Sequence, residues 1–210
     1  MSQVTQARPP YDLCGGHPAL DFVNSLDNRF HADGPRELLA DYADLLRFTR
    51  QTRLLDAGQL RRLADAVDAR AAARALRSAR ELREALAAAF YGGVDQRPPP
   101  PAALKTLERY FHGMSAHQQL RWDRSGPTWD WGDAAAHAEL PVWMLAHAAS
   151  QLMFSEALNR IRACGAESCR WLFLDTSKNH TRRWCKMQVC GNRMKARRFQ
   201  ARSAHSQAPQ

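Results

Sequence analysis

Apolar residues recur three and four positions apart through much of the chain, which is the period of an amphipathic helix. Residues 34–48 show this spacing, with Pro35 at a first helical position. Residues 59–90, rich in alanine, leucine and arginine, predict one or two further helices with a break near 70–77. The glycine pair at 92–93 predicts the end of that helical segment, because glycine weakens a helix and prolines follow it.

The rest of the N-terminal part predicts shorter elements. Residues 102–117 follow a run of prolines and predict another helix. Residues 118–132 alternate apolar and polar positions around a serine–glycine turn, which predicts a β-hairpin with Trp129 and Trp131 on one side, packed in the core. Residues 133–164 predict one or two helices. The expected fold class is therefore α+β, with a mostly helical N-terminal domain that contains a small hairpin.

Polar residues interrupt the apolar pattern near the N-terminus. A helix over residues 19–30 would direct four apolar side chains to the core: Ala19, Val23, Leu26 and Phe30. Asp21 and Asn24 would then lie on another face. Two interpretations stay open: these residues cap turns or face solvent, or they line a pocket for an unknown small-molecule ligand, with Arg29 as an anion partner.

Charge is distributed unevenly along the chain. The sequence has 30 Lys and Arg and 21 Asp and Glu, and no acidic residue follows Asp175. Nine basic residues do follow it, so the other 21 basic residues balance the 21 acidic ones. A run of basic residues without acidic ones, mixed with asparagine and aromatic residues, is typical of a surface that contacts nucleic acid.

Four of the five cysteines lie in the same C-terminal region: Cys164, Cys169, Cys185 and Cys190. The N-terminus lacks the apolar core of a secretory signal, and the longest apolar stretch, 140–154, is too short to span a bilayer. We therefore expect a reducing, cytoplasmic location without membrane attachment, where two close pairs of thiols favour a metal over a disulfide. Four thiolates predict one structural zinc; a redox disulfide or chance clustering are the alternatives.

The cysteine-rich segment also predicts local structure. Residues 170–177 favour a strand, 178–180 a turn, 182–187 a returning strand, and the residues from Met187 onward a helix, which together resemble a treble clef. Asn192 and Arg193 either contact base edges or brace the zinc loop. The remaining candidates for nucleic-acid contact are expected to bind phosphates: Lys178, Arg182, Arg183, Lys186, Lys195, Arg197 and Arg198.

Two motifs resemble known families. The sequence Cys190-Gly191-Asn192-Arg193, with its flanking Trp and Arg residues, resembles the CGNR zinc finger, and residues 15–29 resemble the start of an ABATE domain. The resemblance implies a bacterial, stress-induced transcription regulator, with a ligand- or partner-sensing domain at 1–160, a DNA-binding finger at 161–202 and a disordered tail at 203–210.

Other functional classes stay open at this point. A basic four-cysteine module also suits an RNA-binding or ribosome-associated protein, because charge alone does not distinguish DNA from RNA. The sequence contains no phosphate-binding loop, dinucleotide fingerprint or hydrolase motif, so we expect no enzyme activity. An enzyme with an unrecognised site in the helical domain is the remaining alternative. The oligomeric state is left open.

Overall fold

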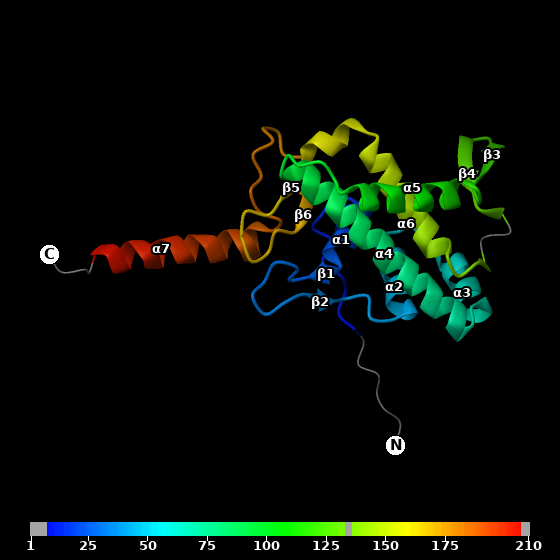
Figure 1. The fold of residues 1–210 in the computed structure, drawn as a ribbon, viewed down its shortest axis with the longest axis horizontal. Helices are drawn as coiled ribbons and strands as arrows, with labels where there is room; N and C mark the ends of the chain where they lie inside the picture. The colour runs from blue at the N-terminus through cyan, green and yellow to red at the C-terminus, as the bar shows by residue number, and fades with distance from the viewer. Residues whose placement is uncertain (1–7, 133–135, 207–210) are drawn as a thin grey trace, which may run out of the picture.

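Figure 1 shows a helical body and a C-terminal helix that projects from it, in the computed structural model of the protein. The structure describes residues 8–132 and 136–206. The helices of the body are α1 (Pro18–Asn24), α2 (Tyr42–Gln51), α3 (Ala57–Ala66), α4 (Ala69–Val94), α5 (Pro101–Ser115) and α6 (Leu140–Met153). Its antiparallel strand pairs are β1 (Leu26–Asp27) with β2 (Arg36–Glu37), and β3 (Gln119–Asp123) with β4 (Gly126–Asp130).

The cysteine-rich finger follows α6 through a short 3₁₀ turn. Its elements are η2 (Glu156–Arg160), β5 (Ile161–Ala163), β6 (Leu172–Leu174), the π-helical turn η3 (Met187–Gly191) and α7 (Asn192–Ser206). The mostly helical α+β class, the hairpin and the C-terminal helix are thereby confirmed. Residues 203–206, expected in a disordered tail, continue α7, and 207–210 lie outside the described residues.

Aspartate side chains set where several helices begin. The carboxylates of Asp41, Asp56 and Asp68 accept the backbone N–H groups of Asp44, Gln59 and Ala71 at the starts of α2, α3 and α4. Each bond satisfies a donor that the first turn of a helix leaves unpaired. The cap at Asp68 also places the helix break at 67–68, earlier than the predicted 70–77, because Val67 is extended.

Helix α1 lies at the centre of the core. Leu20, Phe22 and Val23 are completely buried, and α1 packs against α4, α6 and the finger strand β6. The 26-residue helix α4 runs through the body, and α5 and α6 pack along it. Because β6 contacts α1 directly, the finger is docked on the body.

Two predicted helices are shorter than expected. The helix at 19–30 ends at Asn24 because Ser25 caps it and Asn28 has a φ of 55°, a left-handed value that stops a helix. Leu26 joins strand β1, and Phe30 is 44% exposed instead of facing the core. The helix at 34–48 begins only at Tyr42, since the preceding residues form β2 and pair with β1.

Three further expectations were wrong. Helix α4 passes through Gly92 and Gly93 to Val94, and Gly92 is needed there because a Cβ atom would lie 2.9 Å from the Arg97 carbonyl oxygen. Trp131 is buried, but Trp129 is 55% exposed on the projecting hairpin. Residues 182–187 form no second strand; β6 pairs instead with β5, which precedes it in the chain.

The helices were also compared with the dimensions of a bilayer. Within residues 8–132 and 136–206, none of the helices is both long enough and apolar enough to cross a membrane.

Candidate metal centre and nucleic-acid interface

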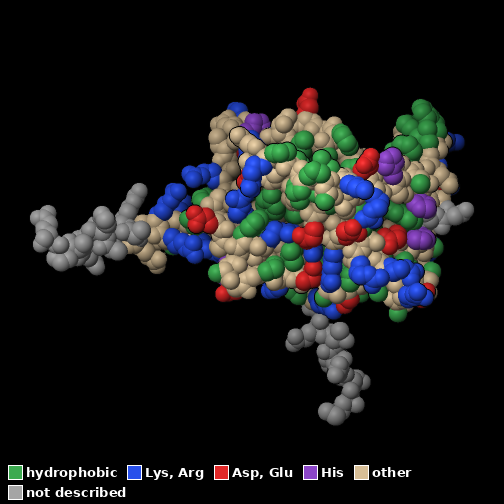
Figure 2. All heavy atoms as spheres, in the orientation of Figure 1, with side chains coloured by type: hydrophobic (Ala, Val, Ile, Leu, Met, Phe, Trp, Pro, Cys, Tyr) green, Lys and Arg blue, Asp and Glu red, His purple; other side chains and the backbone are tan. Residues whose placement is uncertain are grey.

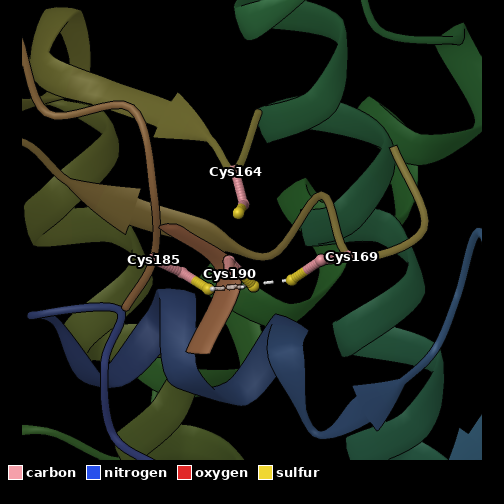
Figure 3. A group of neighbouring side chains, drawn as sticks. All are labelled: Cys164, Cys169, Cys185 and Cys190. Atoms are coloured by element: carbon pink, nitrogen blue, oxygen red, sulfur yellow. Dashed lines mark hydrogen bonds between the residues drawn. The ribbon is translucent and has the colours of Figure 1, made fainter. Parts of the chain in front are cut away.

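The four cysteines of the finger converge on one point. Cys164 directly follows β5, Cys169 lies in the turn before β6, Cys185 lies in the long loop after β6, and Cys190 belongs to η3. Figure 3 shows their sulfur atoms pointing toward one another, and all four lie within 4.8 Å of each other. The two sequence pairs thus meet in one cluster that is positioned to bind a single metal ion.

The spacing of the sulfurs fits zinc. The Cys185 sulfur lies 3.7 Å from that of Cys169 and 3.6 Å from that of Cys190. A regular tetrahedron of sulfurs at the usual zinc–thiolate distance of about 2.3 Å has edges of about 3.8 Å. One zinc held by Cys164, Cys169, Cys185 and Cys190 would therefore require little rearrangement. Four sulfur ligands complete a tetrahedron, so the ion would stabilise the fold and have no position open to a substrate.

The electrostatics of the cluster also favour a cation. Cys164, Cys185 and Cys190 are buried, and Cys169 is half-buried. Hydrogen bonds from the Cys169 and Cys185 thiols lower the pKa of Cys164, and the contact with Cys164 raises the pKa of Cys169. One thiolate thus suppresses ionisation of its neighbours, and only a bound cation offsets the repulsion among four of them.

Two glycines allow the chain to fold closely around the sulfurs. A Cβ atom on Gly191 would lie 2.3 Å from the Met187 sulfur and 3.2 Å from the Trp184 ring, so a side chain on this glycine of the CGNR motif would displace its neighbours. The N–H of Gly165 donates to the Arg183 carbonyl at 2.8 Å, and a Cβ there would lie 3.2 Å from the Trp184 ring. The hydrogen bond between Gly165 and Arg183 joins the two halves of the finger around the cluster.

Asp175 shapes the loop that presents the first basic residues. Its buried carboxylate accepts bonds from the N–H and hydroxyl of Ser177 and from the N–H of Arg182. The hydroxyl of Ser177 contributes most to lowering the pKa of Asp175. The closed loop leaves Lys178 exposed at its tip.

Two of the predicted phosphate-binding residues already have partners within the protein. The Arg182 guanidinium donates to the carbonyl oxygens of Cys14, Trp184 and Cys185, and stacks 4.3 Å from the Phe173 ring centroid. Lys186 forms a 2.8 Å ion pair with Asp12. Both residues therefore connect the finger to the N-terminal loop, and their charge is partly compensated.

The other predicted cations stay exposed. Within the described part of the chain none of them forms an ion pair: Lys178, Arg183, Arg193, Lys195, Arg197 and Arg198. Figure 2 shows Lys and Arg side chains gathered where α7 leaves the body. Asn192 donates to the Gln188 carbonyl at 3.2 Å, which supports the bracing interpretation for its side chain. Arg193 lines a cavity of about 220 Å³ between finger and body, together with Asp27 and Trp171.

The three residues predicted for a ligand pocket each have intramolecular partners. Asn24 donates to the Leu172 carbonyl and accepts the Leu172 N–H, both at 2.9 Å. Asp21 accepts the Gly15 N–H at 2.7 Å, and burial raises the pKa of Asp21 to about 7. Arg29 donates to Glu84 at 3.1 Å. These contacts favour the capping and structural interpretation over the pocket.

The structure also reveals contacts that the sequence pattern did not suggest. The loop before α1 lies on the finger: the Gly15 carbonyl accepts the Leu174 N–H at 2.8 Å, and Cys14 packs against the cysteine cluster. The Trp171 indole donates to the Asp27 carboxylate at 3.1 Å. Cys14 lies 150 to 176 positions from the four finger cysteines, so spacing along the chain gives no signal for its place beside them.

A helical domain joined to a four-cysteine finger with a basic terminal helix defines a class of zinc-finger protein. Sequence models of two known families match the corresponding regions: ABATE, described as "Putative stress-induced transcription regulator", over residues 16–156, and the CGNR zinc finger over residues 160–203. The first match covers more than half of the chain, and the protein belongs to the ABATE family. Both resemblances seen in the sequence are confirmed. A search among curated proteins gives no match.

Proposed function

We propose that the protein is a transcription regulator that binds DNA through its finger. The observation that carries this proposal is α7, a helix without acidic residues whose exposed cations have no partner of opposite charge among the described residues. At about 1.5 Å per residue, its 15 residues extend about 22 Å, which suits insertion into the major groove.

The packing of α7 supports a role in binding. Helix α7 packs on η3 through its first turn, where Met194 lies against the cysteine cluster, and the rest of the helix projects from the body (Figure 1). A short helix of like charges gains little from propensity and loses free energy from repulsion at positions four apart, such as Arg193 and Arg197. Phosphate groups would neutralise that repulsion. Its cations form two stripes, Arg193 with Arg197 and Lys195 with Arg198, which could follow the two backbones of a groove.

The metal centre supports the same role by fixing the direction of this helix. Cys190 is in the turn that immediately precedes α7, so zinc and four thiolates, with a net charge of about −2, would lie at the positive end of the helix dipole. Arg193 is the candidate for reading a guanine edge, because the Asn192 side chain is already bonded to Gln188.

The body supplies the regulation in this proposal. It would bind a ligand or partner produced under stress in the cytoplasm and transmit that event through α1, which is bonded to the finger strand β6. In this proposal the body binds its ligand or partner but catalyses no reaction. Its buried polar side chains support this division of roles, because Asp21, Asn24 and Arg83 are engaged in holding the fold together.

The test compares nucleic acids on the full-length, zinc-loaded chain. Fluorescence anisotropy would measure binding to duplex DNA, a structured RNA hairpin and single-stranded DNA of equal length. The double variant Arg197→Gln/Arg198→Gln should lose affinity for the duplex, whereas Arg61→Gln/Arg62→Gln, which removes the same charge from exposed positions on α3, should not. Tighter binding to the RNA hairpin would favour the RNA-binding alternative. Equal effects of the two double variants would refute a specific role for α7.

A further inference from the structure

A fifth thiol lies next to the four metal ligands. Cys14 is half-buried and packs against the cluster formed by Cys164, Cys185, Cys190 and Phe173. One nitrogen of the Arg182 guanidinium donates to the backbone carbonyls of both Cys14 and Cys185, which places these two residues side by side. The four finger cysteines already complete a tetrahedral ligand set, so Cys14 would stay an uncoordinated thiol in the zinc-loaded protein.

The position of Cys14 is fixed by contacts on both sides. Arg182 donates to the Cys14 carbonyl at 3.2 Å, and Lys186 pairs with Asp12 at 2.8 Å. The Leu174 N–H donates to the Gly15 carbonyl at 2.8 Å. Because Arg182 and Lys186 flank Cys185, these contacts hold the loop carrying Cys14 against the segment carrying Cys185.

We propose that Cys14 makes the zinc centre sensitive to peroxide, through a disulfide between Cys14 and Cys185. The half-buried Cys14 sulfur attacks one oxygen of hydrogen peroxide, becomes a sulfenic acid and releases water. The Cys185 thiolate then attacks that sulfur, forms the S–S bond and displaces hydroxide. In sum, one thiol, one thiolate and one peroxide give a disulfide, one water and one hydroxide; the two sulfurs are oxidised and the peroxide oxygens are reduced.

Cys185 is the partner that the geometry favours. Its carbonyl shares the Arg182 guanidinium with that of Cys14, and because Cys185 is buried while Cys14 is half-buried, solvent oxidant reaches Cys14 before Cys185. Loss of the Cys185 sulfur would leave three ligands and weaken zinc binding. Cys185 and Lys186 directly precede η3 and α7, so the basic helix would lose its anchor. The effect on DNA rests on the proposed function; the disulfide and the zinc release do not.

The test uses the full-length, zinc-loaded, reduced protein exposed to hydrogen peroxide without DNA. A chromogenic chelator reports zinc release, and tryptic mapping without reductant identifies the disulfide. Trypsin distributes the five cysteines over four peptides, with Cys14 on residues 1–29, Cys164 and Cys169 together on 163–170, Cys185 on 184–186 and Cys190 on 187–193. We expect a linkage of 1–29 to 184–186 that appears together with zinc release and is reversed by dithiothreitol.

The matched variant is Cys14→Ser, with Cys14→Ala as a second form if the serine variant does not fold. Either should bind one zinc as the parent does and retain it at the peroxide concentration that strips the parent. Zinc loss from the variant at the parent's rate would overturn the proposal. A parent that links 163–170 to 184–186, instead of 1–29 to 184–186, would overturn it as well. If the oxidised parent binds duplex DNA as tightly as the reduced parent, the disulfide does not control DNA binding. A reduced parent that binds no DNA would instead refute the proposed function and leave the disulfide result standing.

Discussion

Asn24 connects the body to the finger through a single side chain, and replacing it tests how the two are held together. Its amide pairs with both backbone groups of Leu172, at 2.9 Å each, and both residues are buried. Asn24→Ala removes the partner and leaves the Leu172 N–H and C=O unsatisfied. An unsatisfied buried group costs about 1–3 kcal/mol, so the free energy of unfolding should fall by about 3 kcal/mol in total.

This loss is large enough to measure in two ways. For a chain of this size, each kcal/mol corresponds to about 2–4 °C, so the Tm should fall by about 6–12 °C. Urea denaturation followed by circular dichroism, with zinc in excess, would give the free energy directly. Asn159→Ala is the control, because Asn159 is exposed and a surface substitution should change stability by less than about 0.5 kcal/mol.

Asn24→Asp refines the test. A carboxylate still accepts the Leu172 N–H but faces the Leu172 carbonyl without a proton to donate, so this variant should also be destabilised at neutral pH. If Asn24→Ala unfolds at the same urea concentration as Asn159→Ala, the two hydrogen bonds do not hold the finger to the body. Asn24 would then be available to bind a ligand, as the alternative interpretation of the sequence has it.

Three further predictions concern charge, pH and metal. If the five exposed phosphate candidates Lys178, Arg183, Lys195, Arg197 and Arg198 all reach DNA, log affinity should fall with log salt at a slope of about −4.5, and Arg197→Gln/Arg198→Gln should reduce its magnitude by about 1.8 in an anisotropy series over potassium chloride. Equal slopes for parent and variant would exclude these phosphate contacts. Because burial raises the pKa of Asp21 from 3.8 to about 7, the folded protein holds an extra proton between those values, and stability should fall as pH rises through them. Asp21→Asn should lose this dependence, up to about 1.4 kcal/mol per pH unit, in urea denaturation across that range, and a variant that keeps the parent's slope would contradict it. Cys190→Ser should abolish tight binding of the single zinc and unfold the finger while the body helices persist; metal analysis and circular dichroism would check this, and a zinc-free finger with native exchange protection would contradict it.

The sequence was most informative where the chemistry is local. Cysteine spacing predicted the ligand set, and a helical pattern from Met187 onward predicted the basic helix. Each of these signals lies within one short segment of the sequence. The strand pairing of the finger was mispredicted because β5 is only three residues long and has no pattern of its own.

Contacts between distant residues explain the remaining differences. Charge identified Arg182 and Lys186 as cations, but their partners Cys14 and Asp12 lie 168 and 174 positions away. Likewise the sequence shows Asn24 only as a polar residue within an apolar pattern. Its partner Leu172 lies 148 positions away and reaches it only in the folded protein. Such pairings depend on tertiary structure, and a single sequence carries no local signal for them.

The bond between α1 and β6 sets an order of events during synthesis. Helix α1 leaves the ribosome early, and its partner strand follows 148 residues later. At about 5–20 residues per second, this interval is about 7–30 s. During that time Asn24 lacks the backbone groups that it pairs with, and the apolar surface that β6 covers stays open to water. The body therefore cannot reach its final packing until the metal-binding segment has been made, and a chain truncated before Leu172 would be left with an open core.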